Sequence, residues 1–252
     1  MAFSADQLLE KVNTYLATMP YVREPKGLYA PIEYVLSLGG KRIRPVLMLL
    51  SYQLYKENVD DILPQAAGIE TYHNYTLLHD DLMDCADMRR NKPTVHKVWD
   101  ENTAILSGDA MLVLAYRLNN CPERYLKQVM DIFSQTALEI CEGQQWDMEF
   151  ETRNDVTVPE YMEMIRLKTS VLLSAALKIG AVLGGASEDD ARKLYDFGIK
   201  MGLAFQLQDD YLDVYGDSKV FGKNIGGDIL CNKKTFMLIN ALALADGIQR
   251  KE

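Results

Sequence analysis

The chain has 252 residues, enough for one large domain or two small ones, and 48% hydrophobic and 25% charged residues are ordinary for a globular protein with a sizeable core. The formal net charge of −9 argues against nucleic acid and anionic membranes as main partners, so cations that bind an anionic ligand must form local clusters. Four cysteines without a CxxC pair, no secretory leader pattern and an apolar stretch (170–186) interrupted by Lys178 predict a cytoplasmic protein without a membrane span.

Helical periodicity dominates the chain, and prolines stand where several helices would begin. Apolar residues recur at helical spacing over residues 61–83, 122–150 and 159–184. Ser187, followed by three acidic residues, is typical of the N-cap of a further helix. Alternation with period two persists nowhere. The pattern therefore predicts an all-α fold, with roughly eight to ten helices in a single domain over residues 1–252.

Residues 39–45 (Gly-Gly-Lys-Arg-Ile-Arg-Pro) form a candidate anion-binding segment. Glycines that end one helix, then cations, then a proline that opens the next helix combine mobile backbone, positive charge and a helix N-terminus. Lys41 and Arg44 are the candidate ligands. The alternative is that the glycines are only a helix C-cap followed by solvated charges.

Two copies of one acidic pattern, at residues 80–84 (Asp-Asp-Leu-Met-Asp) and 209–213 (Asp-Asp-Tyr-Leu-Asp), are the most informative feature of the chain. Residues four apart on a helix lie on one face, so each copy projects two stacked carboxylates. Such pairs repel unless cations neutralise them, and oxygen ligands suit Mg²⁺. The alternative is a solvated acidic surface. Basic residues soon after each copy favour metal-bound diphosphate, with metal ligands Asp80, Asp84, Asp209 and Asp213.

Other polar residues lie on the same helical segments. His73 precedes Asp80 by seven residues, two helical turns, and therefore shares its face. Glu70 and His73 also match the Glu-x-x-His spacing of di-iron bundles, but the sequence has no second copy, which excludes that class. Lys168-Thr169 and Gln206 interrupt apolar stretches and would face the carboxylates. Their alternatives are a lysine that reaches solvent and a hydrogen-bonded glutamine.

These motifs together resemble the trans-isoprenyl diphosphate synthases of the polyprenyl synthetase family, of the short-chain geranylgeranyl or farnesyl type. The resemblance covers nearly the whole chain. It implies the isoprenoid synthase fold, in which helices surround a deep central cavity. The matching segments are residues 39–45, His73, residues 80–96, Lys168-Thr169, residues 205–213 and residues 222–235.

The family's roles transfer to the matching positions. The four motif aspartates named above would bind three Mg²⁺ ions. The allylic diphosphate would be bound by Arg89, Lys168, Thr169, Gln206, Lys223 and Lys233, and isopentenyl diphosphate, without metal, by Lys41, Arg44, His73 and Arg90. The implied catalytic residues are Lys168, Thr169 and Gln206, which would shield an allylic cation after the diphosphate leaves.

Product length should depend on the residues four and five positions before Asp80, which are Thr76 and Tyr75. In the family, an aromatic residue at the fifth position alone resembles geranylgeranyl makers, and aromatics at both positions resemble farnesyl makers. We therefore expect a C20 product, with C15 second. The alternative is that Tyr75 is an ordinary core aromatic.

Two departures from the family pattern stand out. The sequence ends soon after the lysine-rich segment, so we expect a bundle short of the family's C-terminal helices, and Asn91 replaces a common glycine. The resemblance implies a homodimer. Two alternatives stay open: a class I terpene cyclase, and a non-catalytic regulatory subunit of a synthase. The second acidic motif together with Lys41 and Arg44 argues against the cyclase.

Overall fold

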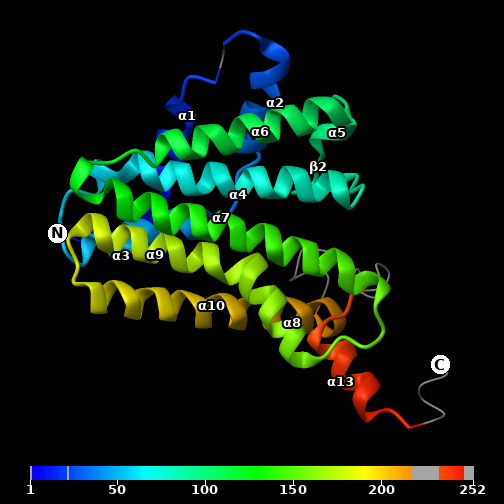
Figure 1. Cartoon of the computed structure of the whole chain (residues 1–252). Helices are drawn as coiled ribbons and strands as arrows, with labels where there is room; N and C mark the ends of the chain where they lie inside the picture. The colour runs from blue at the N-terminus through cyan, green and yellow to red at the C-terminus, as the bar shows by residue number, and fades with distance from the viewer. Residues whose placement is uncertain (1, 22, 217–232, 247–252) are drawn as a thin grey trace. The chain divides into compact units, whose positions relative to one another are not determined.

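The computed structural model describes residues 2–21, 23–216 and 233–246, and within these residues it is helical apart from one short hairpin (Figure 1). The predicted all-α class is confirmed. The elements are α1 Ala5–Thr18, α2 Lys26–Ser37, α3 Ile43–Gln53, the 3-10 turn η1 Val59–Ile62, α4 Leu63–Met83, β1 Met88–Arg89, β2 Lys92–Pro93, α5 Val95–Val98, α6 Glu101–Leu118, α7 Glu123–Thr152, α8 Val158–Ile165, the π-helical turn η2 Arg166–Ser170, α9 Val171–Gly184, α10 Glu188–Tyr215 and α13 Phe236–Leu244.

The helix starts follow from local side-chain chemistry. Ser187 Oγ accepts a hydrogen bond from the backbone N–H of Asp190 at 3.1 Å, as expected for the N-cap of α10. Thr157 and Glu160 form a reciprocal capping box at the start of α8, where Pro159 occupies the first turn. Each cap satisfies N–H groups that the first helical turn leaves without an intrahelical partner. The predicted run at 159–184 is present, but the π-helical turn within it was not predicted.

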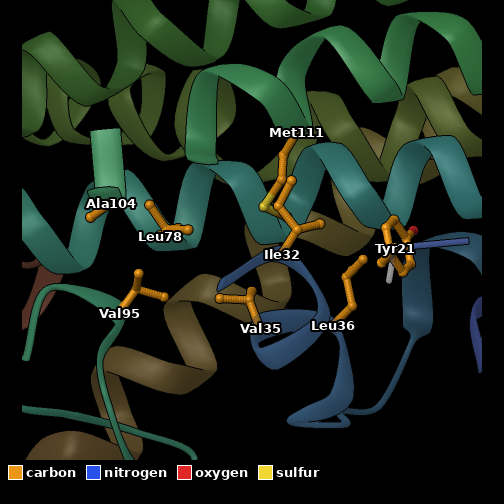
Figure 2. Packing of buried hydrophobic residues seen from close by; sticks show 8 residues of the cluster. All are labelled: Tyr21, Ile32, Val35, Leu36, Leu78, Val95, Ala104 and Met111. Carbon is orange, nitrogen blue, oxygen red and sulfur yellow. The ribbon is translucent and has the colours of Figure 1, made fainter. Parts of the chain in front are cut away.

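The chain forms two compact units by its contacts, residues 1–132 with 176–194, and residues 133–175 with 195–252. In the first unit, α4 packs against α1, α2, α3 and α6. Eight buried residues from and around these helices fill one cluster (Figure 2): Tyr21, Ile32, Val35, Leu36, Leu78, Val95, Ala104 and Met111. This packing fixes α4, which carries the first acidic motif at its C-terminal end.

The second unit has its own buried cluster. It contains Phe150, Val156, Tyr161, Met164 and Ile165, with half-buried residues from α10 and α13 packed against it. The cluster joins the end of α7 to α8 and places α13 beside α8. It therefore supports the helix with the second acidic motif and the segment that leads into α13.

One helix among the described residues, 158–184, is long and apolar enough to span a membrane, with a mean hydropathy of 1.5. Of its most apolar window, 83% is buried inside the protein. A buried core helix meets the same criteria, so this helix is weak evidence for a membrane span.

Close contact between α3 and α9 predicts the effect of one substitution. A Cβ atom on Gly180 would lie 2.2 Å from the carbonyl oxygen of Met48. We expect Gly180→Ala to lower the free energy of unfolding by about 1–3 kcal/mol, because the two backbones must separate. Urea unfolding followed by circular dichroism measures this. Gly27→Ala is the matched control, because nothing lies within 4 Å of its Cβ position, and it should change stability by less than about 1 kcal/mol. Equal effects at both positions would contradict the packing.

Candidate functional site

The first acidic motif lies where α4 ends. Asp80 is in the last turn, and Asp84, the C-cap residue, donates its backbone N–H to the Asp80 carbonyl oxygen at 2.9 Å. The two residues are therefore one turn apart, as predicted. The C-terminal end of a helix carries partial negative charge, which adds to the potential of the two carboxylates. Such a pair attracts a divalent cation, to which substrate phosphate and water would supply the remaining ligands.

The middle aspartate of this motif has a different role from its neighbours. Asp81 is buried, and its two carboxylate oxygens accept from Arg89 Nε at 2.7 and 2.8 Å. Burial raises the pKa of Asp81 to about 6, and the Arg89 guanidinium opposes that rise. Arg89 Nη2 is also 3.7 Å from Asp80 Oδ2. The motif therefore holds Arg89 beside its own outer carboxylate, a link that the sequence analysis missed.

A two-stranded hairpin presents Arg89 and Arg90. β1 and β2 pair antiparallel, and the two residues between them, Arg90 and Asn91, have φ values of 51° and 60°. Both values lie in the left-handed region, which a two-residue hairpin turn of type I′ requires. Asparagine tolerates this region better than most residues, which accounts for Asn91 in place of glycine.

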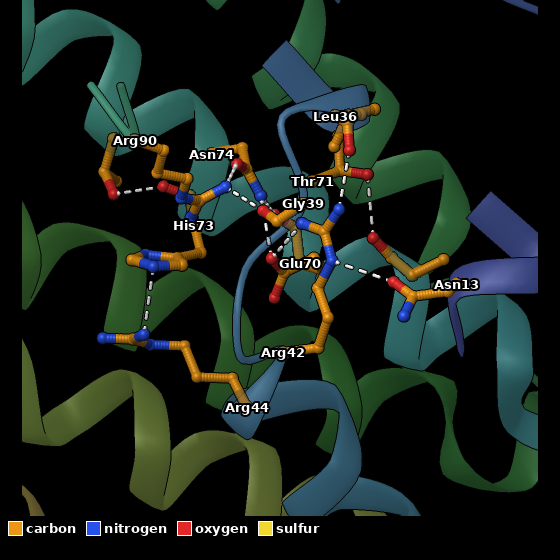
Figure 3. A network of polar contacts seen from close by, with 12 residues as sticks. Asn13, Leu36, Gly39, Arg42, Arg44, Glu70, Thr71, His73, Asn74 and Arg90 are labelled. Atoms are coloured by element: carbon orange, nitrogen blue, oxygen red, sulfur yellow. Dashed lines mark hydrogen bonds and ion pairs between the residues drawn. The ribbon is translucent and has the colours of Figure 1, made fainter. Parts of the chain in front are cut away.

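Three of the predicted isopentenyl diphosphate ligands belong to one cationic cluster (Figure 3). Arg44 Nη1 donates to His73 Nε2 at 3.1 Å. Burial, with Arg44 and Arg90 adding to it, holds the pKa of His73 well below its usual range, so the ring is neutral. Because arginine has only donors, His73 accepts through Nε2 and carries its proton on Nδ1.

Arg90 is the third residue of this cluster, and its guanidinium contacts the two glycines that precede Lys41. Its Nη1 donates to the carbonyl oxygen of Gly39, and a Cβ on Gly40 would lie 3.0 Å from Arg90 Cζ. The glycine therefore allows the guanidinium to lie against the backbone. Lys41, the next residue, is exposed. Arg44 Nε is buried and has no hydrogen-bond partner among the described residues. The cluster thus keeps donor capacity for an anion.

The second acidic motif lies near the end of α10, again at the negative end of a helix dipole. Its middle aspartate, Asp210, is 2% exposed. Asp210 accepts hydrogen bonds from the Tyr161 hydroxyl, from Gln206 Nε2 at 3.2 Å and from the backbone N–H of Phe236 at 3.4 Å. Burial raises the pKa of Asp210, and these donors oppose the rise. Asp210 therefore joins α8, α10 and the start of α13.

Lys168 and Thr169 lie in the π-helical turn η2, a local geometry that is frequent at functional sites. Thr169 Oγ1 donates to Gln206 Oε1 at 3.4 Å, so the structure brings these two predicted residues together. Lys168 Nζ contacts Asp147 Oδ2 of α7 at 2.6 Å. Asp147 is a further residue that the sequence analysis missed. Asp147 lies in a helix where other acidic residues occur, and its sequence position does not indicate a contact with Lys168.

The remaining predicted residues divide as follows. Lys233 is half-buried just before α13, and Lys223 lies outside the described residues. Residues around the first motif belong to one compact unit and those around the second to the other.

Within the described parts of the chain, no three His, Cys, Asp or Glu side chains gather closely enough to hold a metal ion by themselves. The central cavity and the metal sites stay predictions.

The two residues expected to limit product length lie in the middle of α4. The Tyr75 ring is 4.8 Å from the ring of His79 and 5.4 Å from that of Tyr72, between centroids. Tyr75 also packs against the cluster of Figure 2. Thr76 Oγ1 donates to the carbonyl oxygen of His73 at 2.8 Å. Tyr75 is thus held by two aromatic neighbours.

Comparison with known proteins decides the family. The polyprenyl synthetase model matches residues 25–252. The chain belongs to the polyprenyl synthetase family. It is 46% identical, over 87% of its own length and 69% of the relative's, to a protein of Methanosarcina mazei named geranylgeranyl diphosphate synthase. A crystal structure of a geranylgeranyl pyrophosphate synthase is 51% identical with a TM-score of 0.91, covering 96% of this chain and 74% of that one. The chain is therefore a prenyltransferase with the isoprenoid synthase fold.

Other members of the polyprenyl synthetase family add detail. Relatives from Natronomonas pharaonis and Aeropyrum pernix, each 38% identical, are named geranylfarnesyl diphosphate synthases. A polyprenyl synthase from Caulobacter crescentus, solved in complex with calcium and isoprenyl diphosphate, is 29% identical with a TM-score of 0.86. The match covers all of this chain and 78% of that one. A divalent metal ion thus accompanies an isoprenyl diphosphate in that relative.

The hydrogen bond from Tyr161 to Asp210 predicts a change in stability. Tyr161→Phe removes one donor and leaves the buried carboxylate with fewer partners, so we expect the free energy of unfolding to fall by about 1–3 kcal/mol. Urea unfolding at neutral pH measures this. The matched control is Tyr55→Phe, because the Tyr55 hydroxyl has no hydrogen bond among the described residues and its removal should have little effect. Unchanged stability of the Tyr161 variant would contradict the role of this bond.

Proposed function

We propose that the protein is a Mg²⁺-dependent enzyme that condenses isopentenyl diphosphate with an allylic diphosphate to make a short all-trans prenyl diphosphate. The observation that carries the proposal is the presence of two chemically different kinds of diphosphate-binding group. The acidic motifs offer paired carboxylates for metal, whereas Arg44, His73 and Arg90 form a cationic cluster that would bind a diphosphate directly, without metal. A terpene cyclase binds only one diphosphate and therefore does not require a second, metal-free diphosphate site.

The metal ions would be held by Asp80 and Asp84 of the first motif, and by Asp209 and Asp213 of the second, with three ions expected from the family. Bound Mg²⁺ supplies Lewis-acid stabilisation of the charge that develops on the departing diphosphate. Arg89, Lys168, Lys223 and Lys233 would add donors to the same group. The complex of a relative with calcium and isoprenyl diphosphate supports this assignment.

The residues of the chain divide the remaining work. Lys41, Arg44, His73 and Arg90 would retain isopentenyl diphosphate, because side-chain donors bind its diphosphate without activating it as a leaving group. The C–O bond of the allylic diphosphate breaks, the double bond of isopentenyl diphosphate attacks the allylic cation, and the released diphosphate takes the proton lost from the new chain. Thr169 and Gln206, which bond to each other, would direct oxygen dipoles toward the cation.

The functional test supplies labelled isopentenyl diphosphate and C5, C10 or C15 primers, with Mg²⁺ or with excess chelator. We expect prenyl products that depend on both substrates and on Mg²⁺. Asp80→Asn should lower kcat by about 10²- to 10³-fold, because a metal ligand is lost. Asp131→Asn, at an exposed ion pair of α7, is the control and should leave the rate unchanged. Full activity in chelator would contradict the metal assignment, and binding without turnover would point to a regulatory subunit.

Product length gives a separate prediction. We propose a C20 product, with C15 second, because Tyr75 is aromatic and Thr76 is not. Tyr75→Ala should lengthen the products, since a bulky side chain is removed from the path of the growing chain. Thr76→Phe should shorten them toward C15. Chromatography of the dephosphorylated products measures both. Unchanged lengths in the two variants would assign the limit to other residues. The expected homodimer is tested by light scattering on the same samples.

A further inference from the structure

A buried ion pair lies next to the cationic cluster, and none of the substrate roles proposed above uses it. Arg42 Nη1 and Glu70 Oε1 are 2.7 Å apart, and each side chain is 2% exposed. Removing two charges from water is costly, and a buried ion pair is on its own weak evidence for stability. The role of this pair therefore depends on the further hydrogen bonds that its two side chains make.

Arg42 uses all three guanidinium nitrogens within the protein. In addition to Glu70, it donates to the carbonyl oxygen of Leu36 at 2.6 Å and to Asn13 Oδ1 at 3.3 Å (Figure 3). Leu36 is in the last turn of α2, and Arg42 is itself the N-cap residue of α3. Its side chain therefore bridges the two ends of the loop that carries Lys41. Because all three nitrogens already donate within the protein, Arg42 has few N–H groups left to donate to a substrate.

The carboxylate of Glu70 extends the network to the hairpin. Glu70 Oε1 also accepts from Asn74 Nδ2 at 2.9 Å. The other end of that amide, Asn74 Oδ1, is 3.5 Å from Arg90 Nη1, which also donates to Gly39. Figure 3 shows the chain of contacts running from Arg42 through Glu70 and Asn74 to Arg90. One buried carboxylate thus connects the loop and the hairpin arginine.

Glu70 also affects the pKa values of the two arginines proposed to bind the substrate. Burial lowers the pKa of Arg44 to about 10, and Glu70 acts against that change. Burial and the nearby Arg42 lower the pKa of Arg90, and Glu70 again acts in the opposite sense. Glu70 is therefore a counter-charge that the Arg44 and Arg90 guanidinium groups share.

We propose that Glu70 is a positioning residue for isopentenyl diphosphate, acting through Arg42 on the loop with Lys41 and through Asn74 on Arg90. The proposal rests on the function proposed above and extends it to residues that touch no substrate. It assigns the two arginines of the segment 39–45 to different tasks. Arg42 fixes the loop from inside, whereas Arg44, whose Nε has no partner among the described residues, binds the anion.

The first test is Glu70→Gln in the full chain, assayed with both substrates varied. We expect KM for isopentenyl diphosphate to rise about tenfold or more, with KM for the allylic primer unchanged within about twofold, because only one substrate is held by the affected cations. The dissociation constant of isopentenyl diphosphate, measured by calorimetry without metal, should rise by the same factor.

Asn74→Ala is the second variant, because Glu70→Gln leaves the buried Arg42 guanidinium beside a neutral partner, and the cost of an unpaired buried charge is by itself large enough to unfold a protein. Asn74→Ala changes no charge and should raise KM for isopentenyl diphosphate by about three- to tenfold. The matched control is Asn119→Ala. Asn119 is equally buried in the same unit, and its side-chain amide, like that of Asn74, donates to the carbonyl four residues earlier, but among the described residues that side chain makes no hydrogen bond to an arginine. It should alter neither KM.

The outcomes are distinct. A selective rise in KM for isopentenyl diphosphate in the Asn74 variant, absent from the Asn119 variant, supports the proposal. Equal rises for both substrates, a fall in kcat alone, or unchanged constants in a folded Asn74 variant would overturn it. If the unmodified protein neither turns over nor binds isopentenyl diphosphate, the proposed function itself fails, whatever the variants do.

Discussion

Mutual repulsion among the arginines at positions 42, 44, 89 and 90 is the constraint on which the first unit depends. Buried carboxylates balance it at two places, Glu70 beneath the loop and Asp81 beneath the hairpin. Both carboxylates lie on α4, eleven residues apart, which is about three helical turns and hence nearly one face. A single helix therefore supplies the counter-charges for two segments that are distant in sequence. The remaining positive charge is what a diphosphate would neutralise.

Within each acidic motif, the middle aspartate and the two outer aspartates have different roles. Successive helical residues are about 100° apart, so the middle aspartate cannot share the direction of the outer two. Asp81 and Asp210 are buried, and the oxygens of each accept hydrogen bonds from protein donors. The donors differ: Arg89 reaches Asp81 from the hairpin, and Tyr161 with the first N–H group of α13 reaches Asp210. Each middle aspartate thereby fixes a neighbouring segment that carries a proposed substrate-binding cation, Arg89 in one case and Lys233 in the other.

Local chemistry made much of this predictable. The helix starts at Ser187 and near Pro159 and the helical position of both acidic motifs follow from spacing and capping. The grouping of Arg44 with His73 follows only from the resemblance to the family. The spacing of Glu70 indicates only a possible metal ligand, and nothing in the sequence indicates that Asp81, Asn74 and Asp147 are partners of cations. Sequence spacing tells which residues share a helix face. It does not tell which face a neighbouring loop covers, and that depends on contacts between segments far apart in the chain.

The π-helical turn shows why such contacts matter for the second motif. Tyr161 and Thr169 are eight residues apart, and in a regular α-helix they would point about 80° away from each other. Both nevertheless contact α10, Tyr161 at Asp210 and Thr169 at Gln206, which lie one turn apart. The wider turn at 166–170, closed by a hydrogen bond from the Val171 N–H to the Arg166 carbonyl, takes up about one extra residue and reduces this offset. The π-helical turn therefore allows Tyr161 and Thr169 to contact the same helix, α10. Tyr161 donates to Asp210 of the second motif, and Thr169 donates to Gln206 one turn before it.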